Sequence, residues 1–102
     1  MNISAKKIES IKLLCNAHRV SFLAAFGSVT RDDFSKDSDI DFVVDFNETD
    51  PLIYTDLYFD LKDKLEILLK RNIDLVENRA IKNHYFREEL NHTKVILYGN
   101  QN

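Results

Sequence analysis

Two aspartates separated by one residue, Asp39 and Asp41, are the side chains of this chain best suited to hold a cation. They lie in a run at residues 38–46 in which apolar residues alternate with aspartates, the period of a β-strand. On an extended strand both carboxylates point to the same side, roughly 7 Å apart. Like charges at that range repel, and a divalent cation such as Mg²⁺ relieves the repulsion. Because magnesium is usually shared with substrate phosphates, the pair predicts a nucleoside triphosphate substrate.

A phosphate-binding corner is predicted shortly before these aspartates. The apolar run at residues 22–26 ends at Gly27-Ser28, where we expect the chain to turn. Glycine lets the backbone approach a ligand closely, Ser28 adds a hydroxyl, and Arg31 adds a fixed cation. A Gly-Ser pair is by itself a common turn, so the prediction depends on its combination with the aspartates that follow.

A third carboxylate, Asp74, belongs to a short β-prone segment at residues 72–77. If this segment lies beside the strand at 39–46, Asp74 faces the same site and can accept the proton of an attacking hydroxyl, the role of a general base. The alternative reading is a surface aspartate at the start of a strand.

The acidic stretch also fits part of a calcium-loop template. The matching residues are Asp37, Asp39, Asp41, Asp45 and Glu48. The template needs glycine for a sharp turn where this chain has Phe42, inside a Phe-Val-Val run that favours extended backbone. Calcium binding is therefore the weaker hypothesis.

Periodicity and turn signals predict the elements that position these residues. We expect a helix capped by Ser4 and ending near residues 16–19, strands at 20–26, 39–46, 72–77 and 95–98, and helices from Asp50-Pro51 to about Lys70 and at 82–91. The predicted fold class is α/β in the mixed sense (α+β), a mixed β-sheet flanked by helices.

Composition limits the possible functions. With 102 residues, 44% of them hydrophobic, two glycines and one proline, we expect one compact domain over residues 1–102. The net charge of −3 and the scattered basic residues argue against a long nucleic acid as substrate. The single cysteine excludes an internal disulfide. There is no apolar stretch of the roughly 20 residues that a membrane span needs, so we expect a cytoplasmic protein.

Taken together, these residues resemble the minimal nucleotidyltransferase (MNT) domains of the DNA polymerase beta-like superfamily. The signature runs Gly-Ser, then Arg, then Ser-Asp-Ile-Asp before an apolar strand, and a later Asp before Leu-Val. Here it is Gly27-Ser28, Arg31, Ser38-Asp39-Ile40-Asp41 and Asp74-Leu75-Val76. Stand-alone domains of this size resemble the MntA-type antitoxins of HEPN/MNT toxin-antitoxin pairs.

The resemblance implies a polymerase beta-like nucleotidyltransferase fold and an enzyme that moves AMP from ATP to a hydroxyl, a tyrosine on the HEPN partner, and so neutralises the toxin. It implies two Mg²⁺ ions at Asp39, Asp41 and Asp74, which are also the catalytic residues. It further implies nucleotide binding by Gly27, Ser28, Arg31 and Ser38. Many members carry glycine directly after the arginine, whereas this chain has Asp32-Asp33, which predicts weaker nucleotide binding or an altered loop.

Two alternatives remain at this level. The same chemistry can modify a small-molecule hydroxyl, although the chain lacks the extra helical domain of such enzymes. A non-catalytic antitoxin can mask its partner by binding alone, although the three aspartates are intact.

Overall fold

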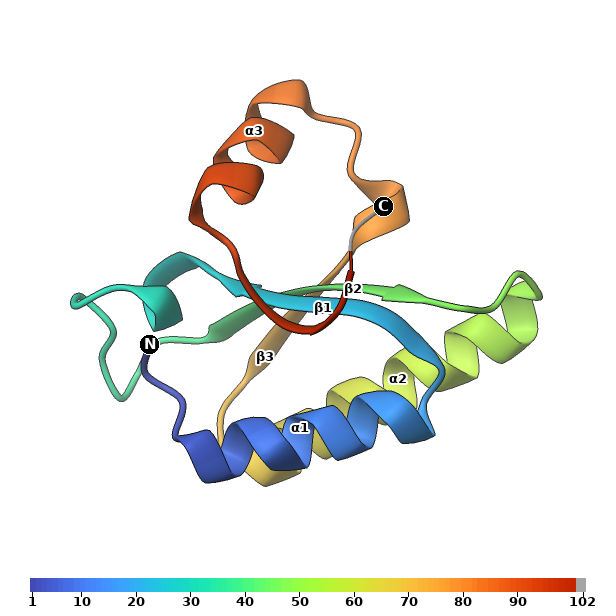
Figure 1. Cartoon of the computed structure of the whole chain (residues 1–102), viewed down its shortest axis with the longest axis horizontal. Coiled ribbons are helices and arrows are strands. Elements are labelled where there is room, and N and C mark those ends of the chain that lie inside the picture. Colours follow the sequence, from blue (N-terminus) through green and yellow to red (C-terminus); the bar gives the residue numbers. More distant parts are fainter. Residues whose placement is uncertain (101–102) are drawn as a thin grey trace.

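A mixed four-stranded sheet with helices on both faces forms the framework. The computed structural model describes residues 1–100. The elements are α1 (Ala5–Ala17), β1 (Val20–Phe26), the 3₁₀ turn η1 (Gly27–Thr30), β2 (Ile40–Phe46), α2 (Pro51–Leu69), β3 (Ile73–Glu77), the 3₁₀ turn η2 (Asn78–Ala80), α3 (His84–Thr93) and β4 (Val95–Gly99). The strand order is β3-β2-β1-β4. Helices α1 and α2 cover one face of the sheet and α3 the other (Figure 1), so the predicted fold class is confirmed.

Strand directions follow from the connections. β1 pairs antiparallel with both β2 and β4, whereas β2 and β3 run parallel. Parallel neighbours need a long crossover, and α2 supplies it. This parallel pair is the one that carries Asp41 and Asp74.

Side-chain caps fix where the helices begin. The Ser4 hydroxyl accepts a hydrogen bond from the Lys7 amide, and the Asp50 carboxylate accepts from the amides of Leu52 and Ile53. Both starts confirm the predictions, and Pro51 occupies the first turn of α2. Helix α3 begins two residues later than predicted because Asn83 caps it by accepting from the Phe86 amide.

The main core lies between the sheet and the pair α1 and α2. Alternate residues of β2 point into it, as predicted, and all four are buried: Ile40, Phe42, Val44 and Phe46. Leu61 and Leu65 of α2 and Ile11 and Cys15 of α1 cover them and are completely buried. Burial raises the pKa of the Cys15 thiol to about 12, so the cysteine is a core residue, as the helical spacing predicts.

A second, smaller core lies on the opposite face, beneath α3. It contains Phe22, Ala24 and Val43 from the sheet and Leu90 from α3. Val43 is fully buried although it shares its face with the aspartates. The sequence prediction assigned only the other face of β2 to a core, and α3 is the element that buries this one.

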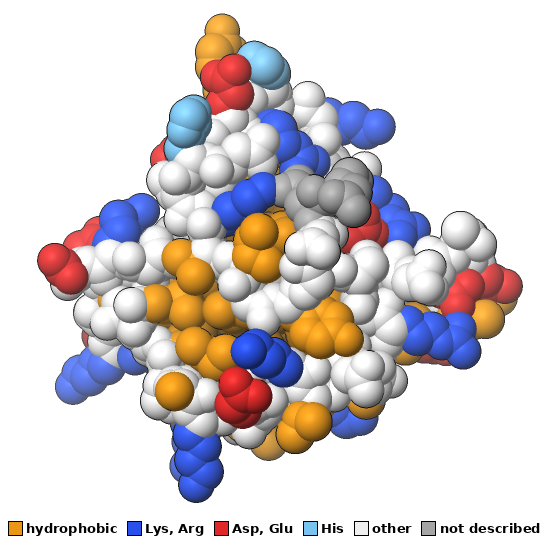
Figure 2. Space-filling view, in the orientation of Figure 1, with side chains coloured by type: hydrophobic (Ala, Val, Ile, Leu, Met, Phe, Trp, Pro, Cys, Tyr) orange, Lys and Arg blue, Asp and Glu red, His pale blue; other side chains and the backbone are white. Residues whose placement is uncertain are grey.

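The open edge of β3 is occupied by side chains of α2. The Glu66 carboxylate accepts a hydrogen bond from the Ile73 amide, and the Tyr58 hydroxyl donates to the Leu75 carbonyl at 2.6 Å. These contacts satisfy outward-facing backbone groups of an edge strand and so disfavour pairing with another chain. At the other edge of the sheet, hydrophobic side chains gather around β4 and α1 (Figure 2), and Val95 and Ile96 of β4 are exposed.

Boundaries otherwise agree closely with the predicted ranges. β1 matches its prediction, and α2, β3 and β4 differ from theirs by a single residue at one end. β2 begins at Ile40. Asp39 therefore precedes the strand, and the prediction that it belongs to the strand is wrong. Within residues 1–100, none of the helices has the length and hydrophobicity needed to cross a bilayer.

Replacement of Leu90 by alanine tests the second core. Because this side chain is 1% exposed, we expect Leu90→Ala to lower the free energy of unfolding by about 3 kcal/mol in urea denaturation. Leu13→Ala removes the same atoms from a side chain that is 73% exposed, and a change of about 0.5 kcal/mol or less is expected. Equal losses in the two variants would contradict the packing of α3.

Candidate active site

The register of the parallel pair places two carboxylates side by side. Asp41 of β2 lies directly opposite Asp74 of β3, and Phe26 of β1 lies opposite Asp41 on its other side. Neighbouring strands are about 4.8 Å apart, and residues paired across them project to the same face. The condition on which the role of Asp74 depends, that its strand lies beside the strand of Asp41, is therefore met, and the role itself stays a prediction.

This row of three residues lies on the α3 face of the sheet. The next row on the same face contains Ala24, Val43 and Val76, two residues further along each strand from the first row. Ala24 and Val43 are buried in the second core. The carboxylates thus stand at the edge of an apolar layer, with Asp41 half-buried and Asp74 exposed.

The environment of Asp41 disfavours its charge. Partial burial is the largest cause that raises the pKa of the Asp41 carboxyl, and the charges of Asp74 and Asp39 raise it further. Arg31 opposes them. A group that is destabilised in its charged form by two nearby carboxylates is a site where a divalent cation is stabilised.

Asp39 reaches the site from outside the sheet. It follows the loop between η1 and β2 and is exposed. Its charge still contributes to the raised pKa of Asp41, which places it in the same electrostatic environment. Asp39 and Asp41 were predicted to lie on one strand, but Asp39 belongs to the loop and only Asp41 to β2.

Gly27 lies directly against the Asp41 carboxylate. Its φ of +73° lies in the left-handed region that favours glycine, and a Cβ at this position would stand 2.5 Å from Oδ2 of Asp41. The turn after it is held by the Thr30 hydroxyl, which donates to the Gly27 carbonyl at 2.7 Å, and by the Arg31 amide, which donates to the Ser28 carbonyl at 3.0 Å. The chain therefore turns at Gly27-Ser28 as predicted, and the turn lies against the carboxylate of Asp41.

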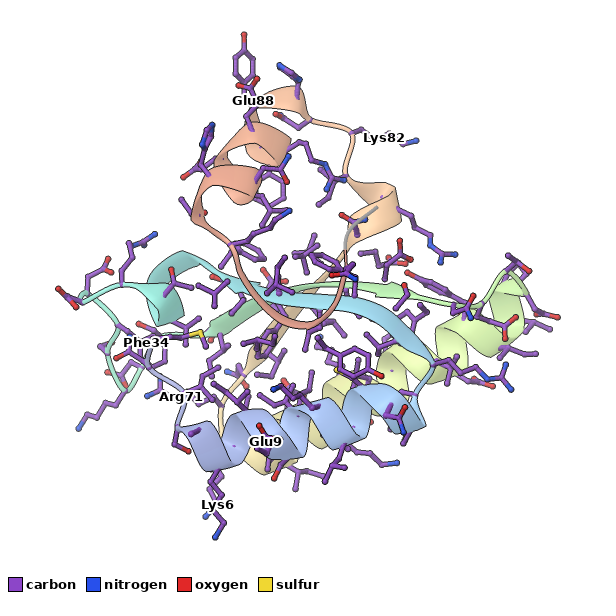
Figure 3. All side chains as sticks on the ribbon, in the orientation of Figure 1. Lys6, Glu9, Phe34, Arg71, Lys82 and Glu88 are labelled. Carbon is purple, nitrogen blue, oxygen red and sulfur yellow. The ribbon has the colours of Figure 1, made fainter. Side chains whose placement is uncertain are left out.

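Arg71 holds the loop that carries Ser38 and Asp39, a role that the sequence interpretation missed. Its guanidinium donates to the carbonyls of Ser35 at 2.6 Å and Ser38 at 2.8 Å. It also stacks 4.2 Å from the ring centre of Phe34, and the two side chains lie together in Figure 3. In the sequence, the one indication of this contact is the basic pair Lys70-Arg71, shortly before β3.

The two serines of the predicted nucleotide site differ in their surroundings. The Ser38 hydroxyl accepts a hydrogen bond from the Ser35 amide and lies 3.1 Å from the Ser35 hydroxyl, so it closes its own loop. Ser28 is half-buried within η1, directly after Gly27. Ser28 is thus the serine at the corner, and phosphate binding by either residue stays a prediction.

Arg31 is paired with Asp33. Nε of Arg31 lies 3.0 Å from one carboxylate oxygen of Asp33, and Nη2 lies 3.4 Å from the other. Both side chains are exposed. Asp33, one of the two residues that depart from the family pattern, therefore pairs with Arg31, the residue that is predicted to bind the triphosphate.

The donor set suits a metal ion that shares its ligands with a substrate. Among residues 1–100, no three carboxylate, imidazole or thiolate groups stand close enough to form a complete protein cage. Mg²⁺ commonly takes only one or two carboxylates and completes its coordination with phosphate and water. The half-buried Asp41, destabilised by its neighbours and open at the glycine corner, fits that pattern.

A calcium loop is excluded by the same geometry. Asp41 and Asp45 lie on a β-strand instead of a loop. Asp45 pairs with Arg79, with Oδ1 2.7 Å from Nη2, and Glu48 pairs with Arg19. Two carboxylates of the template, Asp45 and Glu48, are thus committed to separate partners.

Comparison with known proteins identifies the family. The polymerase beta nucleotidyltransferase family model matches residues 8–102, so the chain belongs to this family of nucleotidyltransferases. A predicted protein adenylyltransferase of Methanocaldococcus jannaschii is 38% identical over 79 residues, which cover 78% of each chain. The protein adenylyltransferase MntA of Thermococcus cleftensis is 32% identical over 83 residues, covering 74% of this chain and 81% of the relative.

Solved structures agree with the fold. The solved structure of a protein assigned as a minimal nucleotidyltransferase superposes with a TM-score of 0.73 at 31% identity, covering 88% of both chains. A chain from the complex of a tri-AMPylated Shewanella oneidensis HEPN toxin with its MNT antitoxin superposes with a TM-score of 0.65 at 20% identity. It covers 93% of this chain and 71% of the other, and at this identity the likeness shows the fold alone.

Replacement of Asp41 by asparagine tests the electrostatics without metal. An acid whose pKa is raised by folding destabilises the native state as pH rises from its ordinary pKa through the raised one, and fully above both. In chelator at neutral pH we therefore expect Asp41→Asn to raise the free energy of unfolding, by less than about 1 kcal/mol because the site is partly solvated. The gain should vanish as pH falls below the ordinary carboxyl value of about 4.

Asp45→Asn is the matched control for this measurement. It makes the same change on the same strand and face, but it breaks the pair with Arg79, so a loss of stability is expected. A loss of stability in Asp41→Asn at neutral pH would show that the charge of Asp41 is compensated within the protein.

The pairing of Arg31 with Asp33 predicts an effect on nucleotide binding. Asp33→Asn frees the guanidinium, and we expect the Kd for ATP to fall about two- to fivefold, the range of an exposed ion pair. Calorimetric titration measures this change. Asp32→Asn removes the same charge next to the pair and should have a smaller effect; equal effects would mean that general repulsion, not the contact, sets the affinity.

Proposed function

We propose that this protein transfers AMP from ATP to a tyrosine hydroxyl of a cognate HEPN-type toxin, in the cytoplasm and with Mg²⁺, and so acts as its antitoxin. The observation that carries the proposal is the pairing of Asp41 with Asp74 at the Gly27-Ser28 corner. The names of the relatives support AMP as the group transferred. The fold shared with the MNT antitoxin of an AMPylated HEPN toxin supports the partner class.

Two Mg²⁺ ions would be held by Asp39 and Asp41, with Asp74 completing one of them. When bound, divalent metal neutralises charge on the phosphates and stabilises the entering and departing oxygens. The protein's part is to keep the carboxylates in place, and Gly27 does so by leaving room for Oδ2 of Asp41. Arg71 fixes the loop that brings Asp39 to the site.

The nucleotide would lie with its triphosphate at the corner. Gly27 permits close approach of the phosphates, Ser28 supplies a hydroxyl, and Arg31 supplies positive charge once it leaves Asp33. Ser38 would act through the loop that it closes, next to Asp39. These roles use groups that already surround the half-buried Asp41.

Asp74 would remove the proton of the acceptor. The acceptor oxygen forms a bond to the α-phosphorus, the bond from that phosphorus to the bridging oxygen breaks, and pyrophosphate leaves with the electron pair. The proton of the acceptor hydroxyl passes to Asp74. Because Asp74 is exposed on an edge strand, a hydroxyl carried by another protein can reach it.

The proposal is tested by incubating the protein with α-labelled ATP, Mg²⁺ and the product of its neighbouring gene. We expect label on the partner, and a loss of about a hundredfold or more in Asp39→Asn and Asp41→Asn, since each removes a carboxylate charge that would hold the metal and, through the metal, the nucleotide phosphates. Asp56→Asn, an exposed position on α2, is the control and should keep the wild-type rate.

Three results would contradict parts of this proposal. No label with wild-type protein, together with inhibition of the toxin by binding alone, would establish a masking antitoxin. Label found on small hydroxyl compounds and never on the partner would establish a small-molecule enzyme. Equal labelling by wild type and both aspartate variants would remove these residues from the metal site.

A further inference from the structure

A hollow of about 420 Å³ lies beside the candidate active site, between β3, η2 and the start of α3. Val76, Ile81 and Phe86 supply its apolar walls, and Ala80 lines its η2 side. None of the predicted site residues lines it. Its position next to the carboxylates suggests a use in the same reaction.

The hollow lies on the same face of the sheet as the carboxylates, the face that α3 covers. Val76 follows Asp74 by two residues on β3 and therefore projects to the same face, roughly 7 Å further along the strand. Phe86 packs edge-to-face on Phe26, with ring centres 5.9 Å apart. Phe26 is the residue opposite Asp41, so the wall formed by α3 reaches from the hollow to the carboxylates.

The walls of the hollow are held in place. Arg87 donates to the side-chain oxygen of Asn78 at 2.6 Å and to its carbonyl at 2.8 Å, which ties α3 to η2. Ile81 packs against the second core. A pocket whose walls are fixed before binding loses little conformational entropy when it is filled.

We propose that this hollow binds the aromatic ring of the acceptor side chain, a phenol presented by the partner protein, with its hydroxyl at Asp74. The proposal rests on the proposed function. A phenol has an apolar body and a polar end, which matches an apolar hollow about one side-chain length from a carboxylate. A serine or threonine acceptor would leave the hollow empty.

The hollow is open to a protein-borne side chain. It lies at the β3 edge of the sheet, and Lys82 on its rim points away from the sheet toward solvent in Figure 3. The acceptor ring can therefore enter from outside the molecule while the nucleotide occupies the corner at Gly27. Donor and acceptor would then approach Asp41 and Asp74 from different sides.

Ala80→Leu fills the hollow without removing any core side chain. We expect transfer to the partner to slow about tenfold or more at low partner concentration, the usual penalty for a blocked apolar subsite, while the Kd for ATP stays within about twofold. Ala17→Leu makes the same change at an exposed position of α1, away from the hollow, and should transfer at the wild-type rate. Wild-type transfer by Ala80→Leu would overturn the proposal.

Binding of a phenol is measured separately from transfer. N-acetyltyrosinamide, titrated into methyl-labelled protein, should shift the NMR signals of Val76, Ala80 and Ile81, and Ala80→Leu should abolish the shifts. Absence of shifts, or shifts confined to Leu13 and Ile67 on the α1 and α2 face, would overturn the hollow as the acceptor site. If wild-type protein shows these shifts but labels no partner, the proposed function fails and the phenol site stands.

Discussion

The candidate active site depends on the enforced proximity of Asp41 and Asp74. Two carboxylates on adjacent strands repel each other, and the half-buried position of Asp41 strengthens the effect, as its raised pKa shows. The parallel register that creates this contact is maintained by the α2 crossover and by the main core beneath β2. The packing of that core holds in place a pair that would separate in a flexible chain. A divalent cation with a phosphorylated ligand, as we propose for this site, would turn the repulsion into attraction.

The surroundings of the pair follow from this constraint. Position 27 favours glycine because its φ of +73° lies in the left-handed region, and a Cβ there would stand 2.5 Å from Oδ2 of Asp41 and displace that carboxylate. Helix α3 must cover the rest of the same face because Val43 and Ala24 would otherwise expose an apolar layer next to the site. That cover stops short of Asp74, which leaves an exposed carboxylate bordered by an apolar hollow. One face of the sheet thus combines a charged region, which we propose for phosphates and metal, with an apolar region, which we propose for the acceptor.

Local patterns predicted most of the fold, because alternation in β2, the caps of α1 and α2, and the Gly-Ser turn are encoded by adjacent residues. They named Asp41 and Asp74 as candidates, but the neighbouring positions of the two strands could be stated only as a condition. Most of what they missed depends on contacts between distant segments. The burial of Val43 requires α3, and the role of Arg71 requires two loop carbonyls more than thirty residues away. The pair of Arg31 with Asp33 is local, but it requires a loop shape that no periodic pattern predicts. The strand pattern also extended β2 to include Asp39, because parity alone does not show where hydrogen bonding to a neighbouring strand begins.

The most direct test of this account is a crystal structure with Mn²⁺ and a non-hydrolysable ATP analogue, in which anomalous scattering locates the metal. The account predicts anomalous peaks within coordination distance of the Asp41 carboxylate, with Asp39 and Asp74 contributing and the triphosphate at Gly27 and Ser28. Metal and nucleotide bound elsewhere, with the carboxylates of Asp41 and Asp74 free of metal, would contradict it.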